Sequence, residues 1–252
     1  MTPKNKNWYK EIWSLDIKNQ SWTEDTKNQV DFIVKTLKLK GNERILDLAC
    51  GFGRHSLELA RRGFSVVGVD ITEEYVLDAT KTADKENLNA EFIHSDIRKL
   101  DFCEEFDVAL NMADGAIGYL ENEEENLKIF DVVAKALKPG GKHLMDIMNA
   151  DYADSHFPCN LWDAGEKGLT LSRFEWDNNS RIMLYGQRDF AHGESLTKPE
   201  FGPGDPIRLY GRKEIEDILA QRRMKVEAVY SRFDGTPGTE NDIQMIVVSK
   251  KG

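Results

Sequence analysis

Cysteines are few in this chain, and they are not spaced as metal ligands or as a disulfide framework. Cys50, Cys103 and Cys159 are its only three cysteines, with no CxxC pair among them. An odd number of scattered thiols is typical of a protein from a reducing compartment. We therefore expect a cytoplasmic protein with no metal site.

Basic residues and long apolar runs are also in short supply. The chain has 34 basic and 44 acidic residues, a net charge of −10, which repels a phosphate backbone. No apolar run approaches the roughly 20 residues that span a bilayer, and the N-terminus lacks the apolar core of a secretory signal. We expect neither a nucleic-acid partner nor a membrane.

Up to about residue 150, short apolar runs alternate with longer amphipathic stretches. Such alternation requires crossover connections and predicts a doubly wound α/β sheet that is mostly parallel. The last two strands are joined by a segment too short for a crossover helix, so the final strand should be antiparallel. Seven strands are expected, at 44–49, 65–70, 91–95, 106–111, 142–148, 224–230 and 242–249, with helices at 23–39, 54–62, 73–87, 123–137 and 212–221.

The alternation of predicted strands and helices ends after residue 149. Two strands, 168–176 and 181–190, are joined by Asp-Asn-Asn-Ser, which is a hairpin signal, and the glycines and prolines of 193–206 predict a loop. We interpret 1–252 as one domain, with 1–40 as an N-terminal helical cap and 151–206 as an inserted antiparallel β-hairpin region over the active edge. Its aromatic residues suggest a roofed pocket for a small molecule. They are equally compatible with the interface of a homodimer.

The most informative stretch, residues 45–55, contains a strand, a glycine turn and the start of a helix. Gly51 and Gly53 allow a sharp turn and the close approach of a ligand. A dinucleotide fingerprint needs a third glycine where Ser56 stands. Asp47 would repel a pyrophosphate but attract an ammonium and a sulfonium, and this favours S-adenosylmethionine over NAD.

Two more acids follow the next strands. Asp70 ends the second strand and can accept both hydroxyls of a ribose, while Asp96 follows the third and can accept an adenine amine. Either acid could instead cap a helix. Ligands of open parallel sheets bind at the carboxyl ends of the strands, so three acids at neighbouring strand ends indicate one site.

These motifs resemble the class I S-adenosylmethionine-dependent methyltransferases. The stretches ILDLACGFGRHS, VVGVDIT, HSDIRKL, FDVALNM and LKPGGKHLMDI follow that family's order, and the antiparallel last strand pair also matches it. The resemblance implies S-adenosyl-L-methionine as cofactor. It also implies the cofactor-binding residues Asp47, Ala49, Gly51, Gly53, Asp70, Ile71, Asp96, Ile97, Asn111 and Met112.

The acceptor side is less well defined by the sequence. Asn111-Met112-Ala113-Asp114 departs from the Asn-Pro-Pro-aromatic motif of enzymes that methylate base amines. The catalytic candidates are Asp114, Tyr119 and Asp146, and His156 and Tyr185 also come into question. Trp8, Tyr9, Trp13 and Trp22 could pin the first helix to the sheet or form a lid that excludes water.

Methyl transfer from a sulfonium needs alignment of the two reactants more than it needs a catalytic triad. We therefore expect a methyltransferase that acts on nitrogen or oxygen of a small molecule. A non-catalytic module that binds S-adenosylmethionine or S-adenosylhomocysteine remains an alternative, and an NAD-dependent dehydrogenase is another.

Overall fold

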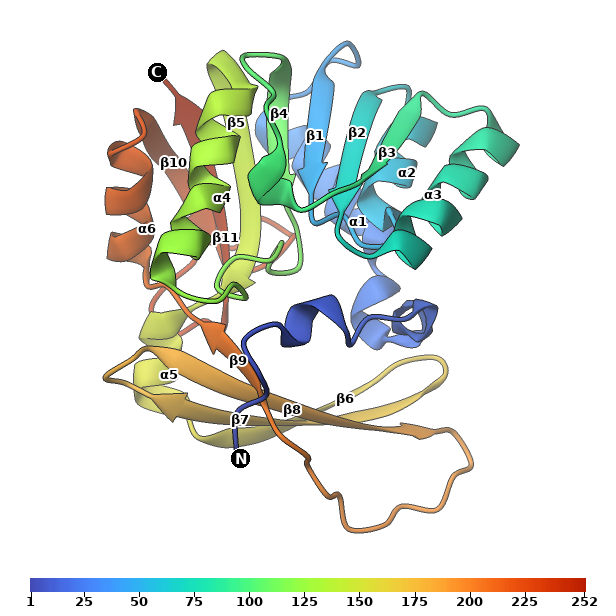
Figure 1. Cartoon of the computed structure of the whole chain (residues 1–252), viewed down its shortest axis with the longest axis vertical. Coiled ribbons are helices and arrows are strands. Elements are labelled where there is room, and N and C mark those ends of the chain that lie inside the picture. Colours follow the sequence, from blue (N-terminus) through green and yellow to red (C-terminus); the bar gives the residue numbers. More distant parts are fainter.

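The molecule contains two β-sheets, with helices packed on the larger one and the N-terminal segment between the two sheets (Figure 1). The computed structural model describes residues 1–252. The larger sheet has seven strands and the smaller one has four. No helix combines the length and the apolar character that a membrane crossing would need.

The seven-stranded sheet confirms the expected doubly wound α/β class. Its order is β10-β11-β5-β4-β1-β2-β3, and β11 runs antiparallel to both β5 and β10. The other neighbours are parallel, so the carboxyl ends of β1 to β4 share one edge. The strands are β1 (Arg44–Leu48), β2 (Ser65–Asp70), β3 (Ala90–His94), β4 (Phe106–Asn111), β5 (Leu137–Met148), β10 (Met224–Tyr230) and β11 (Gln244–Lys251).

Helices cover both faces of this sheet, which explains why strands such as β2 and β4 are almost continuously buried. One buried layer contains Ile33 and Leu37 of the first helix, and the other contains Phe130 and Leu219 of the fourth and sixth helices. The helices are α1 (Thr26–Leu37), α2 (Arg54–Arg61), α3 (Glu73–Glu86), α4 (Glu123–Ala136), α5 (Ala150–His156) and α6 (Arg212–Ala220).

The expected hairpin is present as the centre of a larger antiparallel sheet. Its strands, in order, are β6 (Cys159–Ala164), β7 (Gly168–Asp177), β8 (Ile182–Ala191) and β9 (Asp205–Arg208). The expectation of a loop through residue 206 is wrong at its end. Pro206 belongs to β9, where the edge of the sheet does not require its missing N–H.

A tight contact joins the small sheet to the large one. The Arg208 N–H of β9 donates to the Gly118 carbonyl at 2.8 Å. A Cβ on Gly118 would lie 2.0 Å from the Arg208 carbonyl oxygen, so only glycine allows the two backbones this close.

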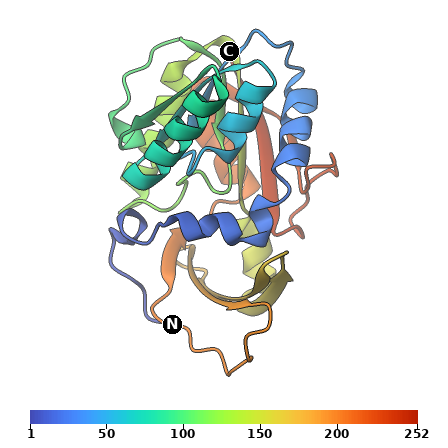
Figure 2. The same cartoon turned by 90° about the vertical axis from the view of Figure 1, so that its right-hand side faces the viewer.

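Residues 1–25, which we term the N-terminal strap, cross the carboxyl edge of the large sheet (Figure 2). The strap forms three short 3₁₀ helices, at Trp8–Lys10, Leu15–Asn19 and Ser21–Thr23. The prediction that Thr23 caps the first helix is wrong, because α1 starts at Thr26 and its N-cap is Asp25. Thr23 instead donates its hydroxyl to the Gln20 carbonyl at 2.8 Å, inside the strap.

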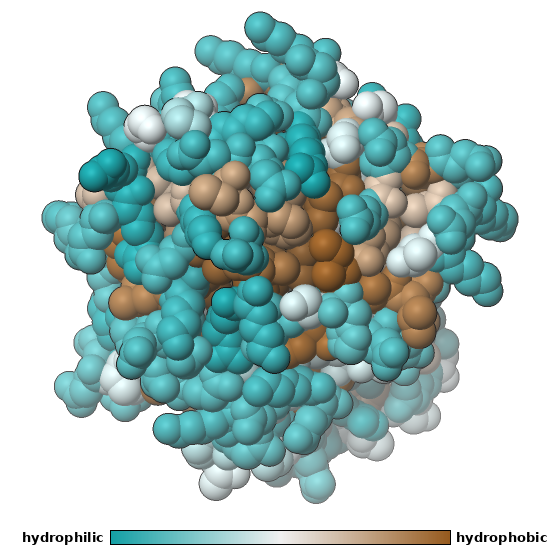
Figure 3. All heavy atoms as spheres, turned by 45° about the horizontal axis from the view of Figure 1, so that its top comes forward, coloured by the Kyte–Doolittle hydropathy of each residue, from teal (hydrophilic) through white to brown (hydrophobic).

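The opposite end of the molecule is open to solvent. Figure 3 turns the top of Figure 1 forward and shows a mostly hydrophilic surface with a central band of hydrophobic residues. At the covered end, the strap and the small sheet meet the carboxyl ends of the strands, where ligands of open parallel sheets bind.

Candidate functional site

The turn between β1 and α2 has the left-handed backbone that its glycines predict. Gly51 and Gly53 have φ values of 57° and 74°, and Ala49 also has a positive φ of 53°. The Gly51 N–H donates to Asp70 Oδ2 at 2.8 Å, and the Thr72 N–H donates to Asp70 Oδ1 at 2.8 Å. Asp70 therefore fixes the turn from the tip of β2, and it is not the cap of α3, which is Thr72.

Asp47 lies beside this turn and is only 1% exposed. Its Oδ2 accepts the Ser56 hydroxyl at 2.6 Å, whereas its buried Oδ1 has no hydrogen-bond partner. Burial, with a smaller contribution from Asp70, raises the pKa of Asp47 to about 6. A buried carboxylate oxygen without a partner is rare in a native fold and requires an explanation, such as a ligand.

Arg54, the first residue of α2, was not among the residues predicted from the sequence. Its guanidinium donates to the Thr26 hydroxyl at 3.0 Å and to Gln29, and it lies 5.2 Å from the centroid of the Trp22 ring. Burial lowers the pKa of Arg54 to about 10, although Asp146 and Asp47 act in the opposite direction. Its position directly after Gly53, the second glycine of the turn, is the sequence feature that could have identified it as a site residue.

A pocket of about 390 Å³ opens at the tips of β2 and β3. This volume is within the usual range of ligand sites, roughly 300–1,000 Å³. Ile97, the first residue of the adjoining 3₁₀ helix, is 6% exposed. The pocket is lined by Lys10, Ile71, His94, Ser95, Asp96 and Lys99.

Asp96 is both a pocket residue and a helix cap. Its carboxylate accepts the Arg98 N–H at 3.0 Å and receives the Arg98 side chain at 2.9 Å (Nε) and 2.6 Å (Nη2). Burial alone would raise the pKa of Asp96, but the hydrogen bonds from Arg98 lower it overall. Asp96 is therefore ionised and held in one orientation at the pocket wall.

Asn111 and Met112 lie at the carboxyl edge, but their side chains face other protein groups. The Asn111 amide donates to the Gly115 carbonyl at 2.9 Å, and its Oδ1 lies 3.1 Å from His143 Nε2. Met112 belongs to the buried layer that packs against α1. If these two residues contact a ligand, they do so through their main-chain atoms.

The loop after β4 is strained. Residues 113–116 all have positive φ, and three of them are not glycine. Such a conformation is costly and occurs mostly where the surroundings of a functional site impose it. It follows directly after Asn111, whose amide holds the loop at Gly115.

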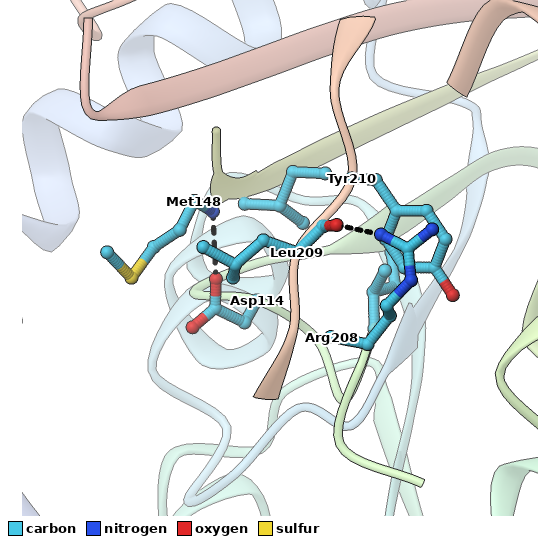
Figure 4. Close-up of a pocket in the computed structure, with 7 residues that line it drawn as sticks. Asp114, Met148, Arg208, Leu209 and Tyr210 are labelled. Carbon is cyan, nitrogen blue, oxygen red and sulfur yellow. Dashed lines mark hydrogen bonds between the residues drawn. The ribbon is translucent and has the colours of Figure 1, made fainter. Parts of the chain in front are cut away.

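The structure brings the three catalytic candidates together on this loop and on β5. The Tyr119 hydroxyl donates to Asp114 Oδ2 at 2.9 Å, and the Asp114 N–H donates to the Asp146 carbonyl at 2.7 Å. Figure 4 shows Asp114 Oδ1 accepting the Met148 N–H, a distance of 3.2 Å. The small pocket drawn there has no room for a water molecule.

Both acids of this group have raised pKa values. Burial, and then the charge of Asp146, raise the pKa of Asp114 to about 6. Burial raises the pKa of Asp146 to about 6, opposed by a hydrogen bond from Gln244. The pKa of Tyr119 is raised by burial and by Asp114, so Tyr119 remains a hydrogen-bond donor at neutral pH.

Aromatic residues of the strap cover this group. The rings of Trp8 and Tyr119 have centroids 5.0 Å apart, and Trp13 stacks on Tyr119 at 6.4 Å. The cluster therefore packs on the loop after β4 and not on α1. Of the predicted strap aromatics, Trp22 is the one that stays well exposed, at 42%.

The remaining acceptor candidates differ in their surroundings. Tyr185 lies in β8, and its hydroxyl contacts Ser172 at 3.2 Å and Gln187 at 2.8 Å. His156 is exposed at the end of α5 and stacks on Tyr152, with the ring centroids 3.9 Å apart. His156 is thus held by Tyr152 of its own helix, and it makes no hydrogen bond to the group around Asp114.

The residues at the turn fit S-adenosylmethionine. The partnerless Asp47 Oδ1 is suited to a cationic group. A Cβ on Gly51 would meet nothing within 4 Å, so the backbone there has free space in front of it. The N-terminus of α2 adds a positive dipole end, which suits a carboxylate.

Comparison with known proteins gives the same result. The protein family described as "Methyltransferase domain" matches residues 45–141. The putative methyltransferase YqeM of Bacillus subtilis is 24% identical over 87% of this chain and 88% of its own length. A glycine/sarcosine N-methyltransferase of Halorhodospira halochloris is 31% identical over 65% of this chain and 66% of its own. A shorter match, 42% identical over 28% of this chain and 16% of the other, is to a 23S rRNA methyltransferase of Shewanella sediminis.

Solved structures share the fold along most of the chain. The CcbJ methyltransferase of Streptomyces caelestis superposes with a TM-score of 0.75, covering 96% of this chain and 94% of that one at 16% identity. With the family match at the glycine turn, these relatives exclude the NAD-dependent dehydrogenase and favour an enzyme over a non-catalytic module. The chain belongs to the class I S-adenosylmethionine-dependent methyltransferases.

Proposed function

We propose that this methyltransferase acts on nitrogen or oxygen of a small-molecule acceptor bound beneath the strap and the four-stranded sheet. The observation that carries the proposal is the Asp114–Tyr119 pair, which Trp8 and Trp13 enclose at the sheet edge where we expect the cofactor to bind. An enclosed group of this kind suits a small acceptor better than a polymer.

The cofactor side of the proposal uses residues of the large sheet. The acids Asp47 and Asp70 would hold the cationic and ribose portions, and Asp96 with Ile71 would hold the adenine. Arg54 would hold the methionine carboxylate. The charges of Asp146 and Asp47 raise the pKa of Arg54, so the three side chains interact. When bound, S-adenosylmethionine would supply a methyl group on a positively charged sulfur.

The acceptor side needs a group that can take a proton. A hydroxyl or an ammonium loses one proton before or during its attack on a methyl group. Asp114 has a pKa of about 6, so it is ionised at neutral pH and yet basic enough to take part in the transfer. Tyr119 would orient the Asp114 carboxylate, and the strap would exclude water.

Assays with a methyl-labelled donor test this proposal. The chain would be incubated with small amines and with their hydroxyl counterparts, beginning with glycine and glycolate. Separate reactions would contain total RNA or a protein extract, and heat-inactivated enzyme is the control. We expect label in a small molecule. Transfer to RNA or protein alone would contradict the proposed acceptor class while leaving the cofactor unaffected.

A further inference from the structure

A single arginine joins the adenine side of the site to the strap. The guanidinium of Arg98 binds Asp96 at 2.6 Å, Glu121 at 2.8 Å and Glu125 at 2.6 Å. The Arg98 side chain is only 14% exposed. Its planar fork can hold carboxylates in fixed directions, which a lysine could not do.

The two glutamates that share Arg98 Nη1 differ in one respect. Glu121 accepts the Tyr9 hydroxyl at 2.9 Å and lies 3.3 Å from Lys10 Nζ, and both partners belong to the strap. Glu125 has Lys128 as its other partner, at 2.6 Å, and that residue lies on α4. Of the two glutamates, only Glu121 contacts the strap, and it holds the Tyr9 hydroxyl where Arg98 Nη2 also reaches it, at 3.4 Å.

We propose that Arg98 is a positioning residue that couples occupancy of the adenine pocket to closure of the strap, through Asp96 on one side and Glu121 on the other. The proposal rests on the cofactor role proposed for Asp96. Lys10 of the strap lines the same pocket as Asp96, so the two ends of this connection meet at one ligand.

The coupling has a simple physical origin. Contact of a ligand with Asp96 would favour the carboxylate orientation that binds Arg98. This would fix the guanidinium and present Glu121 to Tyr9. Thermodynamic reciprocity then requires that strap closure strengthens ligand binding by the same factor as the ligand strengthens closure.

The two glutamates provide a matched pair of variants, Glu121→Gln and Glu125→Gln. S-adenosylhomocysteine is the probe, its affinity is measured by calorimetry, and hydrogen exchange reports on strap amides 8–13 with and without it. In the unmodified chain we expect the probe to slow exchange in the strap. Glu121→Gln should weaken binding about 5- to 50-fold and remove most of that protection. Glu125→Gln should change binding no more than about twofold.

Tyr9→Phe is a second variant that leaves the Arg98–Asp96 contact intact. It should reduce the probe-dependent protection of the strap in the same direction as Glu121→Gln. A merely structural role for Glu121 would lower the melting temperature without changing that protection.

The outcomes distinguish this inference from the proposed function. If the unmodified chain binds the probe but Glu121→Gln and Glu125→Gln behave alike, the coupling is wrong and the cofactor site stands. If the unmodified chain does not bind the probe, the cofactor roles and the coupling are both overturned.

Discussion

The large sheet and the parts that cover its carboxyl edge are held by different forces. Four of the five residues of β1 are buried, whereas five of the six residues of β6 are exposed. In the strap only Trp8 and Tyr9 are buried, and polar contacts such as Tyr9 to Glu121 and Lys4 to Asp205 hold it as well. Regions with few buried residues open at low free-energy cost, so we expect β6 and the strap outside Trp8 and Tyr9 to be the parts that move.

This difference suits a two-substrate reaction. The large sheet presents Asp47, Asp70 and the glycine turn in a fixed geometry, while the strap and the small sheet can open to admit ligands and close to exclude water. The residues at the contact between the two regions, Asp114 and Tyr119, should therefore have the largest effect on catalysis.

The largest effect is expected for Asp114→Asn, which removes the proposed base but keeps its size. We expect kcat to fall roughly 100-fold or more, since proton transfer by a positioned side chain contributes about 10²–10⁴. In the unmodified enzyme kcat should fall as pH drops below about 6, where the Asp114 carboxylate takes up a proton. Steady-state rates across pH check both statements, and unchanged kcat would remove Asp114 from the mechanism.

The second effect contrasts the two regions directly. Ile33→Ala, in the fully buried layer under α1, should lower the free energy of unfolding by about 2–5 kcal/mol. Lys4→Ala, which removes the ion pair between the strap and Asp205, should cost about 1 kcal/mol or less. Denaturant titrations measure both, and equal losses would mean that this contact within the cover, between the strap and β9, is as strong as the packing of the large sheet.

Asp70→Ala tests the fixed half of the site. The substitution would remove the proposed charge-assisted hydrogen bond to the ribose, worth roughly 1.5–3 kcal/mol, and it leaves the Gly51 N–H without its acceptor. The affinity for S-adenosylhomocysteine should fall about 10- to 150-fold in calorimetry. Asp78→Ala is the control: it removes another carboxylate, on α3, whose partner is Lys18, and it should change affinity far less.

The smallest effect concerns stability and pH. The folded-state pKa of Asp146 is raised from 3.8 to about 6, so its contribution to stability is full below pH 4 and is lost as pH rises through about 6. Asn at this position carries no such dependence. The melting temperature of Asp146→Asn relative to the unmodified chain should therefore rise by a few degrees between pH 5 and pH 7.5. A constant difference would show that the Asp146 pKa is not raised.

The same contrast explains what could be predicted from the sequence. The large sheet was predictable because strands buried on both faces, such as β1, β2 and β4, have nearly continuous apolar sequences. β6 was missed because five of its six residues are exposed and its apolar residues do not alternate, and β9 because Pro206 resembles a loop residue. The three 3₁₀ helices of the strap depend on partners far along the chain, which no local pattern reveals.

Predictions for the site divide in the same way. Acids at strand ends can be located from strand periodicity, and Asp47, Asp70 and Asp96 lie at the expected edge. Arg54 and Arg98 were missed because their importance lies in the partners that folding brings to them. Asn111 was expected at a ligand, but its side chain holds the strained loop, a role that depends on His143 of the neighbouring strand.

The contact between Gly118 and the Arg208 carbonyl has a practical consequence for engineering. Exchanging the small sheet for that of a relative with another acceptor would require its last strand to meet the scaffold at this point, where a Cβ would come within 2.0 Å of a carbonyl oxygen. A chimera that replaced residues 150–208 and kept Gly118 would preserve this backbone contact. Any larger side chain at position 118 would push the transplanted sheet away from the large sheet.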